Sequence, residues 1–451
     1  MSRYEMMKRL TLSMIALCAL ATAACTGGKG SSGGGTGDLP TSDSTKPQKA
    51  VDKDAQKYFD QAIAAYEGSK ASPDWTRIEG LFQKAVDRDE DFARAWYNLG
   101  KIAHERGDTD KAAELYEKAF SKDGSFAAPL VNLGMIALDK GETDRAFELF
   151  EQATTVEKYH PEAHVNLAVM YRLRENYPEA VQNVRKALAG DSESLGAYNS
   201  LARIYYELEK YELAKLVCFN ALKFDPENAN IHNVLGLINL RLNEVTPALN
   251  EFRKAVAADP KFIAAHLNIG AVALSTRDYD NALKHFEIVR KLDPKNTEAA
   301  LSMAVAYRGK QELDRAMKGY EEVLKMDPEN AWAHFNIGVM HHEIYAAEAE
   351  DPDKAAGHYR TAIESYRQFL RYDKGSSPQV LKDADQRIAN CTELIETQAM
   401  LREDLANQAE AEAEEKRRAE EEKKRLEEEG GGEKAPDAPD AGGDGGEGAP
   451  E

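Results

Sequence analysis

The feature that most constrains the fold of this chain is a gapless 34-residue repeat that runs from Ala93 to Asn330. One position, recurring every 34 residues, holds Trp96, Leu130, His164, Tyr198, His232, His266, Ala300 and His334. Four residues later the position is always glycine or alanine: Gly100, Gly134, Ala168, Ala202, Gly236, Gly270, Ala304 and Gly338. Further along each unit an alanine recurs, with an apolar or aromatic residue four places after it: Ala112, Ala146, Ala180, Ala214, Ala248, Ala282 and Ala316. Because the pattern is copied in phase, each copy is expected to form the same local structure.

Each unit is predicted to be a pair of short helices joined by a polar turn, because its apolar residues fall at helical spacing within each half. The glycine or alanine is placed where the two helices touch, since a small residue lets the backbones approach, and the aromatic residue fills the groove beside that contact. Asp-Pro pairs disfavour helix at the aspartate and close four units, at Pro226, Pro260, Pro294 and Pro328. One pair cannot bury its apolar faces alone, so neighbouring units are predicted to stack into a solenoid.

The period, the order of small and large residues and the closing proline resemble the tetratricopeptide repeat (TPR) family. The resemblance implies an all-α fold, a right-handed superhelical solenoid of about nine repeats over residues 54–376. A degenerate unit comes first, a unit from Ala331 comes last, and the regular units between them start at Ala93, Ala127, Pro161, Leu195, Ala229, Ile263 and Thr297. In the last unit about 12 residues are added between Tyr345 and Ala362, and we interpret this insertion as a surface loop.

Residues 1–25 have the features of a bacterial lipoprotein signal peptide. A basic start precedes an apolar stretch, residues 10–20, that is too short to span a bilayer. Residues 22–25 resemble a lipobox, although Thr22 stands where leucine is commoner, and the resemblance implies that Cys25 is lipidated. The alternative is ordinary signal cleavage that leaves Cys25 as a free thiol. Residues 26–53 are predicted to form a flexible Gly/Ser/Thr/Pro tether. Thr26 in place of aspartate favours, by the same resemblance, the outer membrane, on its periplasmic face.

Two helices and a tail are predicted after the solenoid. Leu381, Ile388 and Ile395 recur every seven residues, so residues 377–401 are predicted to form an amphipathic helix that caps the last repeat. Residues 402–429 repeatedly place a glutamate four residues before a basic residue, which predicts an exposed helix laced by salt bridges. Residues 430–451 are almost all Gly, Pro, Ala, Asp and Glu and are predicted to be a disordered acidic tail.

Several functional classes are disfavoured. A net charge of −20 argues against nucleic acid as a partner. No acid–base pair stands out among the carboxylates, so we expect no enzymatic activity, no cofactor and no small-molecule substrate. The histidines at the Trp96 position, with His341 and His342, are interpreted as packing residues rather than as metal ligands. Cys218 and Cys391 lie about five repeats apart in a body where only neighbouring units touch, so no disulfide is expected between them.

The candidate binding site is a series of asparagines two residues after the Trp96 position: Asn98, Asn132, Asn166, Asn268 and Asn336. In TPR proteins this position of the first helix faces the concave groove, so the resemblance implies that the amides hydrogen-bond a peptide backbone. Other residues assigned to this face are Lys101, Arg172, Arg203, Tyr206 and Arg308, whose basic members would receive acidic side chains of a ligand. The alternative is that asparagine is simply a common polar residue here. The carboxylate clamp of chaperone-binding TPR proteins is not reproduced, because Tyr97, Val131 and Val165 occupy the place of its first lysine.

These features together predict a non-enzymatic, lipid-anchored scaffold that assembles an envelope-spanning complex. The layout of signal, tether, repeats and acidic tail resembles the TPR lipoproteins of myxobacterial gliding-motility complexes. The alternatives are a pilotin-like assembly factor for a type IV pilus or secretion system, and an adaptor for cell-wall enzymes. The expected partners are protein or peptide ligands in the concave groove and, through the lipid anchor, a membrane.

Overall fold

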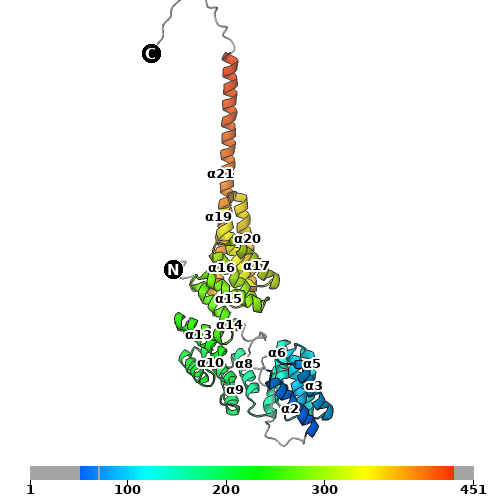
Figure 1. Ribbon diagram of the computed structural model, residues 1–451. Helices are drawn as coiled ribbons and strands as arrows, with labels where there is room; N and C mark the ends of the chain where they lie inside the picture. The colour runs from blue at the N-terminus through cyan, green and yellow to red at the C-terminus, as the bar shows by residue number, and fades with distance from the viewer. Residues whose placement is uncertain (1–50, 70–71, 431–451) are drawn as a thin grey trace, which may run out of the picture. The chain divides into compact units, whose positions relative to one another are not determined.

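The computed structural model describes residues 51–69 and 72–430, and every element within them is a helix (Figure 1). The predicted all-α fold is thereby confirmed. Cys25, the signal segment, nearly all of the predicted tether and the tail after Gly430 lie outside the described residues. Contacts between Cα atoms divide the chain into two compact units, one that ends at Gly319 and one that begins at Tyr320.

The helices alternate between the first and the second member of a hairpin. The first helices are α2 (Lys53–Glu67), α4 (Ala93–Glu105), α6 (Ala128–Asp139), α8 (Pro161–Leu173), α10 (Leu195–Glu207), α12 (Ala229–Arg241), α14 (Ile263–Ser275), α16 (Thr297–Gly309) and α18 (Ala331–Val339). The second helices are α3 (Trp75–Arg88), α5 (Thr109–Lys122), α7 (Thr143–Val156), α9 (Tyr177–Gly190), α11 (Tyr211–Ala221), α13 (Val245–Ala258), α15 (Tyr279–Leu292), α17 (Leu313–Met326) and α20 (Pro352–Tyr372). We number positions in each hairpin so that Trp96 and its equivalents occupy position 4.

Side-chain caps begin many of the first helices. The side chains of Ser194, Asn228, Asn296 and Asn330 each accept a hydrogen bond from the backbone N–H three residues later, at 3.4, 3.1, 2.9 and 3.0 Å. Each such bond satisfies one of the N–H groups that the first turn of a helix leaves without an internal partner. The first helices consequently begin where the repeat predicted, except that α6 starts at Ala128 rather than at Ala127.

The turn inside each hairpin depends on one residue with positive φ. This residue recurs every 34 positions, and φ lies between 57° and 80° at Gly107, Gly141, Glu175, Glu209, Asn243, Arg277 and Gln311. A left-handed residue after a helix reverses the chain direction within one turn, and glycine adopts it at the least cost. The hairpins of Gly107 and Gly141 have glycine at this position, whereas the later hairpins have a residue with a side chain, for which positive φ is strained.

An aspartate at position 31 shapes the turn between hairpins. Asp123, Asp259, Asp293 and Asp327 each accept the backbone N–H two residues on, at 2.9, 2.9, 3.1 and 3.2 Å. Helices α13 and α15 end directly before this aspartate, as the Asp-Pro pairs predicted. The prediction is wrong for α11, which ends at Ala221, before Phe224 and Asp225. There the N–H groups of Phe224 and Asp225 both bond the Ala221 carbonyl, so a tight turn replaces the last helical residues.

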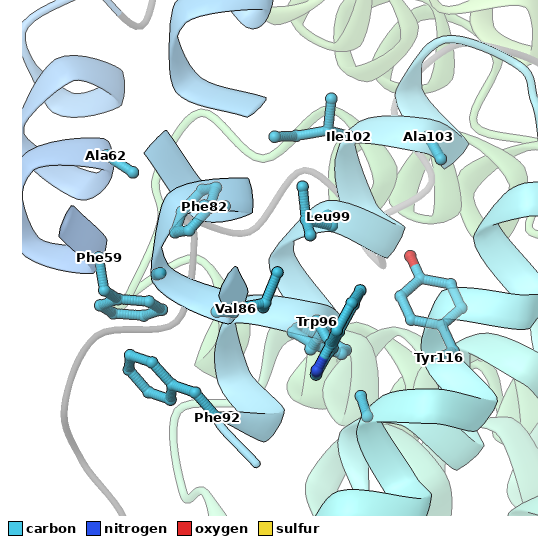
Figure 2. Close-up of a cluster of buried hydrophobic side chains, with 14 of the residues drawn as sticks. Phe59, Ala62, Phe82, Val86, Phe92, Trp96, Leu99, Ile102, Ala103 and Tyr116 are labelled. Carbon is cyan, nitrogen blue, oxygen red and sulfur yellow. The ribbon is translucent and has the colours of Figure 1, made fainter. Parts of the chain in front are cut away.

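Small and large side chains interlock where the two helices of a hairpin meet. An added Cβ at Gly100 would lie 2.6 Å from the ring of Tyr116, and one at Gly236 would lie 2.4 Å from the ring of Phe252. The close contact predicted at position 8 is therefore present. Figure 2 shows the core at the N-terminal end, where the Phe59 ring lies 5.4 Å from that of Phe82 and 4.9 Å from that of Phe92.

The insertion in the last hairpin is helical, which corrects the predicted loop. Helix α18 continues through a π-helical turn, η1 (Met340–Tyr345), into α19 (Ala346–Glu348), and α20 begins at Pro352. Only residues 349–351 lie outside a helix. The added residues extend both helices because a π-turn absorbs extra residues without breaking the helix, and the Asp351 side chain caps α20.

The two helices predicted after the solenoid form one continuous helix, α21 (Pro378–Gly430). Its first part packs on α20 and α18, with Ala384 and Cys391 fully buried among Phe335, Tyr366 and Phe369. From residue 399 to residue 427 every residue is exposed, and Figure 1 shows this part extending beyond α20. None of the helices in the described part of the chain is both long enough and apolar enough to cross a bilayer.

Candidate functional site

The predicted peptide-binding asparagines lie on the first helices, and three of the five are buried. Asn98 is fully buried, Asn268 and Asn336 are buried, and Asn132 and Asn166 are half-buried. This is a correction to the expected row of accessible amides. It arises because consecutive first helices pack against each other along this face, as α8 does on α10 and α10 on α12.

The buried polar residues form rungs between consecutive first helices. Asn132 Nδ2 donates to Tyr97 Oη at 2.8 Å, and Asn268 Nδ2 donates to Asn233 Oδ1 at 2.9 Å. Both pairs are separated by 35 residues, which is one repeat plus one residue. Burial raises the pKa of Tyr97 to about 12, so its phenol is neutral at physiological pH. These amides therefore hold neighbouring repeats together.

Three of the predicted residues come together at the middle of this face. Arg172 on α8 forms an ion pair with Glu207 on α10, and Arg203 and Tyr206 lie on α10 itself. Arg241 on α12 donates from Nε to Tyr206 Oη at 2.7 Å, and its guanidinium lies 5.6 Å from the ring centroid. The remaining predicted basic residues, Lys101 on α4 and Arg308 on α16, lie on other hairpins.

We call Arg172, Arg203, Tyr206, Glu207 and Arg241 the central cluster. It contains three guanidinium groups and one carboxylate. Burial, and after it the charge of Arg172, lowers the pKa of Arg203 to about 10, so the group remains charged at neutral pH. Arg172 Nε is buried without a hydrogen-bond partner. The cluster thus carries an excess of positive charge together with an unsatisfied donor, and carboxylates are the natural ligands of such groups.

Glu207 and Arg241 were not predicted as members of the site. Both are spaced 35 residues from a cluster partner, Glu207 from Arg172 and Arg241 from Tyr206. The signal that would have found them is this spacing, because the repeat length plus one residue connects facing positions on consecutive first helices. A search at the repeat length alone compares equivalent residues and does not detect partners.

The residue at position 4 anchors the turn that precedes its own helix. The ring N–H of Trp96 donates to the carbonyl of Glu90 at 2.8 Å. The Nε2 atoms of His232, His266 and His334 bond the carbonyls of Pro226, Pro260 and Pro328 in the same way, at 2.9, 3.1 and 3.1 Å. The hydrogen bond that His232 Nδ1 donates to Glu251 Oε2, at 2.6 Å, raises the pKa of that histidine. These side chains act in packing and capping.

The histidines of the last hairpin pair with one another rather than with carboxylates. His341 Nδ1 lies 3.0 Å from His358 Nδ1, and His342 Nδ1 lies 3.4 Å from Tyr366 Oη. Across residues 51–69 and 72–430, no three His, Cys, Asp or Glu side chains are grouped so that they could hold a metal ion. Cys218 and Cys391 are both buried free thiols.

Stacked helical hairpins whose first helices share one face define the class of helical-repeat interaction proteins. Family models described as tetratricopeptide repeat match residues 93–126, 131–194 and 199–261, and a model described as TPR repeat matches residues 305–344. Tetratricopeptide repeats are thus recognised in these segments, and the described part of the chain has the all-α fold of a TPR solenoid. No curated protein sequence matches it significantly.

Several solved structures have a similar fold. A chain of the APC/C hetero-tetramer Cut9–Hcn1 is 16% identical with a TM-score of 0.49, over 61% of this chain and 54% of that one. Yeast Tom70 is 17% identical with a TM-score of 0.45, over 83% of this chain and 72% of its own. PilF of Pseudomonas aeruginosa is 22% identical with a TM-score of 0.39, over 47% of this chain and 96% of its own. This chain thus spans about half the length of the Cut9–Hcn1 chain, and the likeness concerns the fold alone.

Proposed function

We propose that this protein is a non-enzymatic scaffold that binds acidic segments of protein partners on the face formed by its first helices. The observation that carries the proposal is the central cluster, in which three arginines on adjacent first helices are accompanied by a single carboxylate, Glu207, which pairs with Arg172. The chain as a whole is strongly acidic, with a net charge of −20, whereas the central cluster carries three arginines and one glutamate. A TPR solenoid supports the general role, since such repeats form extended binding surfaces.

Arg203 is the residue most suited to contact a ligand. It is half-buried and belongs to no ion pair among the described residues, whereas Arg172 and Arg241 are already engaged with Glu207 and Tyr206. A guanidinium in this setting forms short, charge-assisted hydrogen bonds with an incoming carboxylate. Such a contact is worth about 1.5–3 kcal/mol, which corresponds to roughly a tenfold or greater change in affinity.

The test is a crosslinked pull-down from membranes with wild type and an Arg203→Ala variant, quantified for each recovered protein. Arg308→Ala serves as the matched control, because Arg308 is also a half-buried arginine on a first helix but lies on another hairpin. We expect at least one partner to be lost with Arg203→Ala and retained with Arg308→Ala. Recovery of the same partners in the same amounts from both variants would refute the central cluster as the binding site.

We propose further that Cys25 carries a lipid anchor that holds the scaffold at the outer membrane, on its periplasmic side. The support lies in the sequence alone: a basic start, an apolar stretch of signal length, and small residues before Cys25. A Cys25→Ser variant should lose metabolic labelling by fatty acid and should no longer fractionate with the outer membrane. Labelling that persists in this variant would disprove the anchor.

From the layout of the chain we propose that the scaffold assembles an envelope-spanning motility complex. The alternative partners are proteins of a pilus or secretion system and cell-wall enzymes, which would bind the same face of the solenoid. The pull-down described above discriminates among them by the identity of the partners that depend on Arg203. Motility-complex proteins would support the first assignment, and a pilin or secretin would replace it with the second.

A further inference from the structure

Helix α11 has an apolar outer face that no other regular second helix has. At positions 19, 22 and 25 it carries Leu213, Leu216 and Phe219, which are 45%, 56% and 54% exposed. The equivalent residues in the other regular hairpins are polar or charged, apart from one proline: Lys111, Glu114 and Glu117; Arg145, Glu148 and Glu151; Glu179, Gln182 and Arg185; Pro247, Asn250 and Arg253; Asn281, Lys284 and Glu287; Arg315, Lys318 and Glu321. The repeats thus act as internal controls, and the fold does not require apolar residues at these positions.

The outer residues of α11 are also separate from its packing residues. Ala214, Val217, Cys218 and Ala221 are buried and fill the core positions of this helix. Phe224, in the tight turn that shortens α11, is exposed as well, but its ring lies 5.8 Å from that of Tyr198 on α10. We call Leu213, Leu216 and Phe219 the α11 patch. A contiguous exposed patch of large apolar residues on a soluble surface marks a binding surface.

Basic residues flank the α11 patch. At position 25 the order along consecutive second helices is Glu117, Glu151, Arg185, Phe219, Arg253 and Glu287, so the charge is reversed only beside the patch. Arg185 and Arg253 are exposed and form no ion pair among the described residues. Two α11 patches placed face to face would bring these arginines together, and like charges across an interface oppose association. The flanking charges therefore call for an acidic partner.

A surface with the opposite charge and a matching apolar stripe lies on α21. Met400, Leu401 and Leu405 are 60%, 45% and 47% exposed on the part of this helix where every residue is exposed and where Arg402 pairs with Asp353 of α20 at 3.1 Å. Leu401 and Leu405 are one helical turn apart and so lie on the same side. Residues 402–415 contain six carboxylates and one arginine: Glu403, Asp404, Glu410, Glu412, Glu414, Glu415 and Arg402.

We propose that the Leu401–Leu405 stripe of α21 in one copy of this protein docks on the α11 patch of a second copy. The carboxylates beside the stripe then meet Arg185 and Arg253, while the leucines cover Leu216 and Phe219. The contact joins two different surfaces, so after one contact the first copy still has a free patch and the second copy a free stripe, and assembly continues head to tail. The apolar area on each side is small compared with a standard interface, so association is weak and concentration-dependent. The docking surface differs from the face in the proposed function and does not depend on it.

The test measures the mass of the chain from residue 26 onward, which carries every described element, by sedimentation over a wide range of concentration. Wild type should form species larger than a monomer as concentration rises, and added salt should dissociate them. Phe219→Glu, or Leu401→Gln combined with Leu405→Gln, should raise the dissociation constant about tenfold or more. Leu173→Gln and Leu426→Gln are matched controls, because they remove exposed leucines outside both surfaces, and they should behave as wild type.

Mixing the two defective variants gives the sharper test. Phe219→Glu retains an intact α21 stripe, and the Leu401→Gln/Leu405→Gln variant retains an intact α11 patch. Each should be monomeric alone, and the mixture should form a one-to-one dimer that grows no further. A wild type that is monomeric at every concentration would overturn the proposal, and so would a mixture that remains monomeric. If Phe219→Glu abolished assembly but Leu401→Gln/Leu405→Gln did not, the α11 patch would bind something other than α21. That result would refute the proposed docking of α21. Circular dichroism checks that each variant is folded.

Discussion

At the scale of single residues, the hairpins are held together by compensating sizes at positions 8 and 24. Glycine at position 8 faces an aromatic ring in the pairs Gly100–Tyr116, Gly134–Phe150, Gly236–Phe252 and Gly270–Phe286. In two hairpins alanine at position 8 goes with a smaller residue at position 24, Ala168 with Val184 and Ala202 with Cys218. The hairpin that starts at Thr297 differs: it has Ala304 at position 8 and Tyr320 at position 24, and the residue in close contact with Ala304 is Gly319. A small residue thus lies at each close contact, as expected of a close-packed interior.

This pairing predicts the effect of adding a single methyl group. Gly236→Ala places a Cβ 2.4 Å from Phe252 Cε1, so we expect it to lower the free energy of unfolding by about 1–3 kcal/mol. Phe252→Val added to this variant should recover part of the loss, because it recreates the alanine–valine pairing of Ala168 and Val184. Urea denaturation followed by circular dichroism measures both changes.

Gly80→Ala is the matched control for this experiment. Gly80 also lies in a helix, α3, but nothing is within 4 Å of an added Cβ. There alanine should be neutral or stabilising by about 0.5–1 kcal/mol, since it restricts the unfolded chain and favours the helix. Equal destabilisation at Gly80 and Gly236 would show that backbone flexibility, rather than the ring contact, explains the glycine.

At the scale of helices, one hairpin is joined by a pair of histidines. His266 Nδ1 on α14 lies 2.8 Å from His285 Nδ1 on α15, and His266 Nε2 bonds the Pro260 carbonyl. Only one of the two facing nitrogens can carry a proton, so the pair requires at least one neutral ring. Burial, and after it the neighbouring ring of His266, lowers the pKa of His285 to about 4, and burial also lowers the pKa of His266.

The direction of these shifts predicts sensitivity to acid. The unfolded histidines have a pKa near 6.5 and bind protons before the folded ones do, so stability is full above about pH 6.5 and is lost as pH falls toward 4. Allowing for solvent screening, the pair should account for about 1–2 kcal/mol of this loss. A His285→Gln variant should therefore show a smaller fall in melting temperature between pH 7 and pH 4 than wild type. The control is His104→Gln, in a hairpin without a histidine pair, and its melting temperature should fall with pH as that of wild type does. If the melting temperature of His285→Gln fell by the same amount as that of wild type, the His266–His285 pair would be excluded as a cause of the acid sensitivity.

At the scale of the whole molecule, α21, the last helix among the described residues, has two different parts. The part of α21 before residue 399 packs Leu381, Ile388 and Ile395 on the last hairpin, and Arg387 bonds Glu343 at 2.7 Å and Asp383 at 2.8 Å. The part after it has no buried residue up to residue 427; it bonds α20 through Arg402 and Asp353, at 3.1 Å, and carries i,i+4 ion pairs such as Arg418–Glu414, at 2.6 Å. Pairs of this kind support an isolated helix by only a few tenths of a kcal/mol each.

Two truncations distinguish these two parts. Removal of residues 399–451 should leave the melting temperature unchanged, because it exposes no buried apolar surface. Removal of residues 378–451 should lower it markedly, since each large apolar side chain that loses its cover costs about 1.5–3 kcal/mol. Calorimetry of the two truncated chains beside wild type measures the difference. The same melting temperature for both truncations would mean that α21 does not cap the last hairpin.

The sequence alone was sufficient for the repeat, its phase and the helix starts. Each 34-residue unit carries its own helical periodicity, small contact residues and closing aspartate, and these are local signals that act within one hairpin. Departures from the repeat were predicted less well. The insertion before Ala362 was expected to be a loop, because sequence alignment shows how many residues are added but not that a π-turn and two longer helices absorb them.

The tertiary structure alone decided which polar residues are available for binding. Asn98, Asn268 and Asn336 repeat at one helical position, as a row of ligand-binding amides would, yet all three are buried, and Asn268 bonds Asn233 on the preceding first helix. The partners Glu207 and Arg241 lie one repeat and one residue away, a spacing set by how neighbouring hairpins stack rather than by the helix period. Likewise, Leu213, Leu216 and Phe219 can be recognised as an exposed apolar patch only when the buried side of α11 is known. Periodicity specifies what each helix pair forms by itself, whereas the contacts between pairs specify which of its residues remain exposed.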